Sequence, residues 1–206
     1  MSVEFAIDPV SDSAEAAVAA ARRLVASLLR ADQVPAGEMA EIAGQLDELA
    51  DRMESSLPPV TPRARTWASR SIEDAALRNP ANGRQNAIAP GLSFRGLPDG
   101  SVEGEVTLGP PYEGPPGCVH GGVSALLLDH LFGAANHWAG ATGPTAELTL
   151  RYRRPTPLLT PLTLRARQES ADGRKLRTRG VIEAGGKTCV EAEGLFIVKS
   201  DFGVSS

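Results

Sequence analysis

The distribution of apolar residues divides the chain into a helical N-terminal part and a mainly β-structured remainder. Apolar residues recur every three to four positions in residues 12–31 and again from Glu38 to about Ser55, which predicts two amphipathic helices. Residues 33–37 interrupt the pattern with a proline and a glycine, so we expect a helical hairpin. Its apolar stripe must be buried on its own chain or on another subunit.

A proline-rich segment follows the two predicted helices. Residues 57–62 read Leu-Pro-Pro-Val-Thr-Pro, a composition that ends a helix and is typical of a stiff linker. We therefore expect a helical hairpin and linker over residues 1–60 and a second domain over residues 61–206. The chain of 206 residues is long enough for both.

From about residue 91 the pattern changes to that of strands. Residues 92–97 and 102–108 flank a Pro-Asp-Gly turn, which predicts a β-hairpin. Residues 121–136 are apolar nearly all round, as is typical of a buried helix. We expect four more strands in a meander, over residues 145–153, 162–169, 176–182 and 187–198.

This order of elements indicates the fold class. A helix that is apolar on every side needs cover on every side, and a single antiparallel sheet curled around it supplies that cover. The sequence thus predicts an α+β fold in which an antiparallel sheet wraps around a central helix, with an N-terminal helical extension.

The most informative chemistry lies at the start of the predicted central helix. Two glycines, Gly121 and Gly122, follow His120 there, and a lone carboxylate, Asp129, lies among leucines farther along. A helix start offers unpaired backbone N–H groups to an oxygen atom, and glycine permits close approach of a ligand. A buried carboxylate is costly unless it is paired, protonated or catalytic. The segment therefore supplies a candidate electrophile-binding site and a candidate base.

The charge distribution changes this picture little. Residues 1–56 carry four basic and eleven acidic side chains, and the whole chain has a net charge of −4. Nine basic residues lie between Arg151 and Arg179, against only Glu169 and Asp172. They indicate either solvated strand faces or a local field that attracts an anionic ligand. Nucleic acid is a poor candidate partner, because the chain is acidic and has no basic and aromatic stacking platform.

The remaining composition argues against several other classes of protein. Cys118 and Cys189 form no metal-type spacing and no disulfide framework, which suits a reducing, cytoplasmic location. The three histidines have no thiol or carboxylate cluster beside them, so we expect no metal and no cofactor. There is no secretory signal and no apolar run of 18 residues, so no membrane span is expected.

The segment from Tyr112 to Gly122, with Asp129 nine residues after the histidine, carries a family resemblance. It reads Tyr-Glu-Gly-Pro-Pro-Gly-Cys-Val-His-Gly-Gly and resembles PaaI-type hotdog-fold acyl-CoA thioesterases, in the branch with an EGPPG-x-VHGG loop. Residues 145–155 also resemble the strand after that family's helix. The similarity covers roughly residues 75–199, so it says little about the N-terminal helices.

The resemblance implies hydrolysis of a coenzyme A thioester to a carboxylic acid and a free thiol. The backbone N–H of Gly121 then matches the oxyanion donor, and Asp129 matches the nucleophile or general base. Thr145 matches a hydroxyl that helps to hold the water, while His120 matches the motif histidine with a positioning role. Some relatives carry an asparagine six residues before this histidine, where the present chain has Gly114.

The substrate-binding residues expected from this reading are Gly122, Arg153 and Arg154. Gly122 permits close approach of the ligand at the helix start, and the two arginines would bind phosphates of the coenzyme. Each residue also has a structural interpretation. Asp129 could be a buried carboxylate paired with an arginine, His120 could brace the loop, and the arginines could be solvated strand ends.

Helix geometry adds an expectation about assembly. Gly121 and Asp129 are eight residues apart in one helix, which separates them by about 12 Å and places them on different sides. One substrate carbonyl cannot be reached by both from the same chain. We therefore expect a homodimer, or a dimer of dimers, in which Gly121 of one subunit meets Asp129 of another.

Three functions remain open at this point. The favoured one is an acyl-CoA thioesterase. The others are a non-catalytic acyl-CoA-binding module, and a different hotdog enzyme such as a hydratase, which is disfavoured because no paired Asp and His lie at hydratase-like spacing.

Overall fold

The computed structural model describes residues 12–58 and 76–198. Its first two elements are helices α1 (Asp12–Leu28) and α2 (Ala36–Glu54), which confirms the two helices expected near the N-terminus. The expected domain boundary at residue 60, with most of the proline-rich linker, lies outside the described residues. No helix in these described ranges has the length and apolar character needed to cross a membrane.

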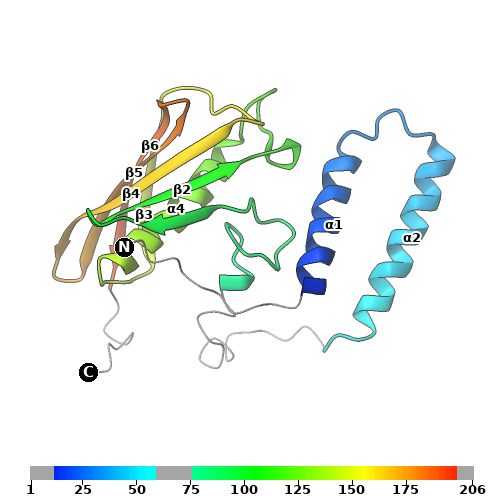
Figure 1. Ribbon diagram of the computed structural model, residues 1–206, viewed down its shortest axis with the longest axis horizontal. Coiled ribbons are helices and arrows are strands. Elements are labelled where there is room, and N and C mark those ends of the chain that lie inside the picture. Colours follow the sequence, from blue (N-terminus) through cyan, green and yellow to red (C-terminus); the bar gives the residue numbers. More distant parts are fainter. Residues whose placement is uncertain (1–11, 59–75, 199–206) are drawn as a thin grey trace.

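The rest of the described chain is one antiparallel sheet with a long helix packed against it (Figure 1). The helix is α4, Gly121–Trp138, and a short 3-10 helix, η3 (Pro110–Tyr112), precedes it. The sheet has six strands in the order β1-β2-β4-β5-β6-β3. Their bounds are β1 Ser93–Gly96, β2 Ser101–Thr107, β3 Thr145–Tyr152, β4 Pro161–Asp172, β5 Lys175–Ala184 and β6 Lys187–Ile197.

The strand order corrects one expectation. The last four strands do not form a continuous meander, because β3 pairs with β6 at the edge of the sheet and not with β4. Strands β4, β5 and β6 do form a meander, while β4 joins the first hairpin through β2. Sequence periodicity locates a strand but does not identify its neighbours, and consecutive strands are often not adjacent.

Glycines on the sheet make room for the large side chains of α4. A Cβ atom at Gly180 would lie 2.5 Å from the Cε1 atom of Phe132, and one at Gly194 would lie 2.8 Å from its Cδ2 atom. At Gly96 a Cβ would collide with the ring of Trp138. Phe132 is fully buried in this niche. These glycines therefore set how closely the helix approaches the sheet.

Only one side of α4 is covered within the chain, contrary to the expectation of cover all round. The side that faces the sheet is fully buried, including Leu127, Leu128 and Leu131. On the other side, Leu126 and Asp129 are only half-buried. A single sheet on one side of the helix leaves the opposite side for another molecule to cover.

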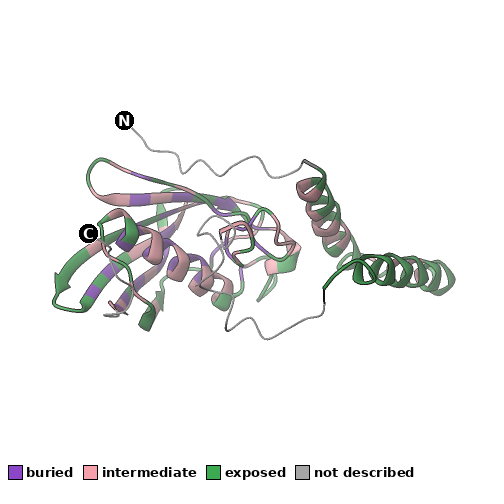
Figure 2. Ribbon diagram, turned by 90° about the horizontal axis from the view of Figure 1, so that it is seen from below, coloured by how far each residue is buried: buried purple, intermediate pink, exposed green. Residues whose placement is uncertain are grey.

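The N-terminal helices extend away from the sheet (Figure 1). Helix α1 is attached to the loop before β1, since Arg22 donates hydrogen bonds to the carbonyl oxygens of Gly83 at 3.1 Å and Asn86 at 2.8 Å. Glu15 adds an ion pair with Arg84, at 3.2 Å. Helix α2 buries none of its residues (Figure 2). The expected apolar stripe is thus present and is left uncovered by its own chain.

The glycine niche generates a prediction about stability. Gly180→Ala should lower the free energy of unfolding by about 2 kcal/mol, because its Cβ would meet Phe132 and the Arg165 carbonyl oxygen, both at 2.5 Å. Chemical denaturation of both proteins measures the difference.

The matched control for that variant is Gly109→Ala. There the new Cβ would meet only the Pro111 Cδ atom, at 3.8 Å, and φ is −101°, which alanine adopts freely. We expect little change in its stability. Equal stability of the two alanine variants would contradict the role assigned to the niche.

Candidate active site

The loop before α4 is held in place by backbone contacts. Glu113 forms an antiparallel bridge with Val119, and its Oε1 atom accepts a hydrogen bond of 2.6 Å from the Gly117 N–H. The Val119 N–H donates to the carbonyl of Thr156, at 2.8 Å, which ties the loop to the segment between β3 and β4. Gly117 has φ of +73°, a conformation that favours glycine. The loop therefore delivers the chain to the helix start in a fixed geometry.

His120 is the N-cap of α4. Its backbone is extended, with φ of −61° and ψ of 134°, and its Nδ1 atom accepts a hydrogen bond of 3.0 Å from the Gly122 N–H. This agrees with the positioning role expected for the motif histidine. The contact also satisfies the Gly122 N–H, so that donor is not free for a ligand.

Gly114 packs directly against this cap. A Cβ atom at Gly114 would lie 2.7 Å from the Cα atom of His120. The asparagine that some relatives carry at this position would therefore require the loop to move. In the present geometry this position therefore has no room for an amide side chain.

The backbone N–H of Gly121 remains available at the helix start. It has no hydrogen-bond acceptor among the described residues. The carbonyl oxygen of Gly121 accepts a hydrogen bond from the Tyr152 hydroxyl, at 2.9 Å, and a Cβ at Gly121 would lie 2.9 Å from the same oxygen. A free N–H at the positive end of a helix dipole can bind a developing negative charge.

Tyr152 is a residue of this site to which the sequence assigned no role. Strand alternation places it on the same side as Leu148 and Leu150, and the structure confirms that it reaches the helix. It remains 57% exposed at the end of β3. The alternation of apolar residues in β3 could have indicated which way Tyr152 points, because Tyr152 is the last residue of that strand. It could not show that the strand ends beside Gly121.

Asp129 and Thr145 are brought together at the other end of β3. Thr145 is the first residue of the strand, and its hydroxyl donates a hydrogen bond of 2.7 Å to the Oδ1 atom of Asp129. No described residue donates to the Oδ2 atom, which therefore remains available to a water molecule or a ligand. The carboxylate is half-buried on the side of α4 that the sheet does not cover.

Gly121 and Asp129 are not brought together within the chain. Helix α4 is continuous from residue 121 to residue 138, so the spacing of about 12 Å holds. Contrary to the expectation that they lie on different sides of the helix, both border β3, an edge strand with one neighbour: the Gly121 carbonyl bonds to Tyr152 and the Asp129 carboxylate bonds to Thr145. The two halves of the predicted chemistry therefore lie on an open surface and not in a closed pocket.

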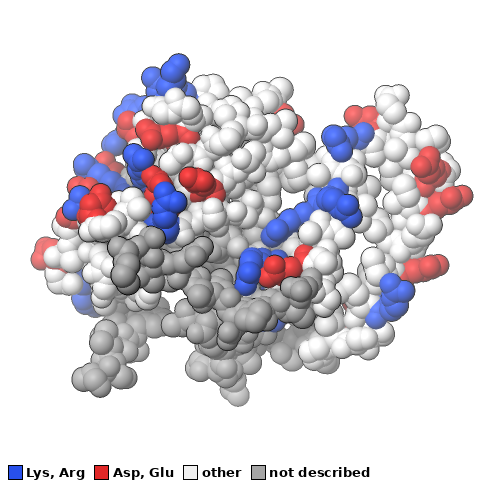
Figure 3. Space-filling model, in the orientation of Figure 1, with Lys and Arg blue, Asp and Glu red and all other residues white. Residues whose placement is uncertain are grey.

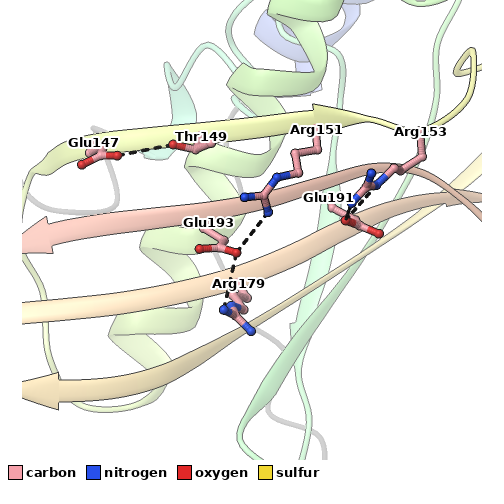
Figure 4. A network of polar contacts seen from close by, with 7 residues as sticks. All are labelled: Glu147, Thr149, Arg151, Arg153, Arg179, Glu191 and Glu193. Atoms are coloured by element: carbon pink, nitrogen blue, oxygen red, sulfur yellow. Dashed lines mark hydrogen bonds and ion pairs between the residues drawn. The ribbon is translucent and has the colours of Figure 1, made fainter.

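Arg153 and Arg154 already have partners. The Nε and Nη2 atoms of Arg153 contact the Oε2 atom of Glu191 at 3.0 and 2.8 Å, and this hydrogen bonding lowers the pKa of Glu191 (Figure 4). Arg154 donates a single hydrogen bond of 2.8 Å to the backbone carbonyl of Thr188. Arg153 is thus neutralised locally, whereas Arg154 keeps its charge unpaired among the described residues.

Neighbouring strands neutralise part of the basic segment. Arg151 and Arg179 both contact Glu193, at 3.3 and 3.4 Å, and Arg165 contacts Glu103 at 2.8 Å (Figure 4 shows the first two pairs). Both signs of charge are interspersed over this part of the surface (Figure 3). With Arg153, four of the nine basic residues are paired with glutamates from outside the segment, which weakens the field that it could exert on an anion.

The described residues contain no group of three or more His, Cys, Asp and Glu that could hold a metal ion. Cys118 is half-buried and Cys189 is buried, and both are free thiols. Beside these thiols, the groups described at the site are backbone N–H groups, hydroxyls and the Asp129 carboxylate.

His130, beside Asp129 in the sequence, is a histidine in apolar surroundings. Its ring contacts Phe94 edge to face with centroids 5.5 Å apart, and its Nε2 atom is buried without a hydrogen-bond partner. Burial lowers the pKa of His130 from its ordinary value of 6.5, and the Asp129 carboxylate opposes this shift in part. Burial therefore disfavours the charged form of this histidine in the folded protein.

Comparison with known proteins gives consistent results for both parts of the chain. The profile described as "Thioesterase superfamily" matches residues 116–191, and the profile described as "Hypothetical protein RHA1_ro05818, N-terminal helical domain" matches residues 6–62. The crystal structure of protein RHA08564, a thioesterase superfamily protein, is 46% identical, covers 92% of each chain and has a TM-score of 0.80.

Curated relatives match the region around the site. The acyl-coenzyme A thioesterase THEM4 of Xenopus laevis is 36% identical over 91 residues, which are 43% of this chain and 41% of that one. The protein of the same name from Bos taurus is 36% identical over 94 residues, or 43% and 37%. The match thus spans well under half the length of these curated relatives.

The environment of His130 predicts a pH dependence of stability. The unfolded chain binds a proton at this residue as the pH falls below 6.5, whereas the folded protein resists it. The contribution of His130 to the free energy of unfolding should therefore be fully present above that pH and should decline below it. In His130→Leu the loss of unfolding free energy between about pH 7.5 and about pH 5 should be smaller than in the unmodified protein. Identical losses in denaturant titrations would contradict this.

Proposed function

Since the chain belongs to the thioesterase superfamily, we propose that it hydrolyses a thioester of coenzyme A to a carboxylic acid and free coenzyme A. The observation that carries this proposal is the free Gly121 N–H at the start of α4, on the same side of the helix as the Asp129–Thr145 pair. The names of the curated relatives, which match the same region, support the choice of an acyl-CoA substrate.

The helix start supplies the electrophilic half of the reaction. When a thioester carbonyl is attacked, negative charge develops on its oxygen, and a preorganised N–H donor stabilises that charge. Gly121 offers such a donor, and its missing side chain leaves the approach open. Tyr152 fixes the neighbouring peptide through the Gly121 carbonyl, so we assign it a positioning role.

Asp129 supplies the nucleophilic half. With Oδ1 held by the Thr145 hydroxyl, the Oδ2 atom can accept a proton from an attacking water or attack the carbonyl itself. In the first case Thr145 keeps the carboxylate oriented toward the water. In the second a mixed anhydride forms and the coenzyme thiolate leaves, and water then releases the acid.

The two halves meet only if two chains combine, so we propose a composite site across a dimer. Edge strand β3 has one unpaired side, and the side of α4 beside it is not covered by its own chain. A second copy that pairs with β3 would cover both and bring a partner's Asp129 near Gly121. Exposed edges of this kind favour pairing with another strand.

Substrate binding is proposed for the surroundings of the helix start. Gly122 lets the thioester approach the helix, although its own N–H is used by His120. Arg154 is the better candidate for a coenzyme phosphate, because it is bound only to a neutral carbonyl. Arg153 would have to leave Glu191 first.

We also propose that the chain divides near residue 60 into a helical unit, residues 1–60, and a thioesterase domain, residues 61–206. One matching profile ends at residue 62, close to this boundary, and the other begins at residue 116. Helix α2 buries no residue, which supports a unit that depends little on the domain beside it.

The oxyanion role of Gly121 can be tested by removing only its N–H group. Gly121 is the first helical residue, where proline is tolerated, and ψ of 134° at His120 suits a residue before proline. Gly121→Pro should lower kcat by about 10²–10³-fold. Gly121→Ala places a Cβ at the same point, 2.9 Å from the Tyr152 hydroxyl, but keeps the N–H and should lose far less. Equal losses in the two variants would exclude the N–H as the donor.

The role of Asp129 predicts a loss of turnover with retention of binding. Asp129→Asn should reduce kcat by about 10²–10⁴-fold, since an amide can neither accept the proton nor attack. Affinity for a non-hydrolysable thioether of coenzyme A, measured by calorimetry, should stay within a few-fold. Glu147→Gln, which neutralises a carboxylate two residues from Thr145, is the control and should keep full turnover.

The same two inactive variants test whether the site is composite. In a dimer of one Asp129→Asn chain and one Gly121→Pro chain, one composite site carries both changes and the other carries neither. Random mixing should restore about a quarter of the unmodified activity, because half of the dimers are mixed and each has one intact site. If each site lies within one chain, the mixture stays inactive.

A further inference from the structure

The apolar residues of α2 form a seam of the kind that packs against another helix. Met39, Ile42, Leu46, Leu49 and Met53 are spaced alternately three and four residues apart along the helix. This is the spacing of positions a and d in a heptad repeat, which aligns side chains in a single stripe for contact between helices. We call these five residues the α2 seam.

The described chain covers the α2 seam only in part. None of its residues is fully buried: Met39, Ile42 and Leu46 are half-buried, while Leu49 and Met53 are 44% and 59% exposed. Gly44, in the middle of the helix, has no neighbouring atom within 4 Å of where a Cβ would lie. Apolar surface left exposed in this way favours contact with another molecule.

The charges of α2 are arranged so that a second α2 can approach. Positions beside the seam carry Ala43, Gln45 and Ala50, which are small or neutral. Five carboxylates lie at heptad positions on the far side, namely Glu41, Asp47, Glu48, Asp51 and Glu54. In the space-filling view acidic side chains gather along the outer edge of α2 (Figure 3). Although α2 is acidic, its carboxylates lie away from the seam. Two α2 seams can therefore approach without strong charge repulsion.

Two charged residues do flank the seam, and they are complementary. Glu38 in the first turn and Arg52 in the last turn occupy the same heptad position, two heptads apart. Neither makes an ion pair with any residue in the described ranges. When two such helices run antiparallel, each end brings a Glu38 beside an Arg52. A parallel pair would place each of them beside an uncharged residue.

We propose that the α2 seam packs antiparallel against the same seam of a second copy of this chain, with Glu38 of each copy opposite the partner's Arg52. A self-complementary helix of this kind fits a two-fold axis, because the same surface is used on both copies. The contact is separate from β3 and from the open side of α4. It does not rest on the proposed function.

Cross-linking tests this geometry in the full chain. Residue 45 lies midway between residues 38 and 52, so Gln45→Cys should bring two new thiols together across the axis. Mild oxidation with copper phenanthroline should give a covalent dimer on a non-reducing gel. Asp51→Cys points away from the seam and is the control, and the unmodified chain accounts for Cys118 and Cys189. Cross-linking of neither variant, or of both equally, would overturn the proposal.

Charge reversal provides a second readout that does not depend on new thiols. Glu38→Arg should raise the dissociation constant of the α2-mediated assembly about tenfold in sedimentation, since arginine then faces arginine at both ends. Glu38→Arg combined with Arg52→Glu restores opposite charges and should return within about threefold of the original value. If the double variant is no tighter than the single, α2 packs on another surface, such as the body of a partner, and the proposal fails.

Discussion

The structure depends on how closely α4 packs against the sheet. Phe132 fits only because Gly180 and Gly194 carry no side chains, and Trp138 fits only because Gly96 carries none. Interiors are packed as densely as crystals, so these contacts fix the helix in one position. That position determines where the helix begins and on which side Asp129 emerges. The residues of the proposed site, on the opposite side of the helix, are therefore positioned by packing in which they take no part.

The same packing explains why one side of α4 is not covered within the chain. The single sheet lies against the opposite side of the helix, and the residues that it leaves half-buried include Leu126 and Asp129. Strand β3 forms the border of this uncovered side and contacts α4 at both of its ends, through Thr145 to Asp129 and through Tyr152 to the Gly121 carbonyl. Because β3 is also an edge strand, a partner that pairs with it would approach both ends together. The proposed dimer contact and the proposed site therefore share the β3 edge.

The parts that the sequence predicts well are those determined by local patterns. The central helix, the hairpins and the segment from His120 to Asp129 are continuous in the chain, so periodicity and turn residues reveal them. Pairing of β3 with β6 is a tertiary choice that no local pattern encodes. The same holds for Arg165, whose partner Glu103 is 62 residues away, so that counting charges along one segment overstated its field. The sequence assigned no role to Tyr152, because that role depends on a hydrogen bond to Gly121, 31 residues earlier.

The N-terminal helices are held in place differently from the core. Helix α1 is tied to the body by Arg22, which makes two hydrogen bonds to backbone carbonyls, whereas α2 has only its connection to α1 and its own backbone. Helix α2 buries no residue fully and leaves Leu49 and Met53 exposed, and an exposed apolar surface of this kind favours association. Because α1 is anchored, the orientation of the α2 seam is linked to that of the sheet. A second copy bound there would therefore be held at a defined position relative to β3, and the helical unit would influence which chains meet at that edge.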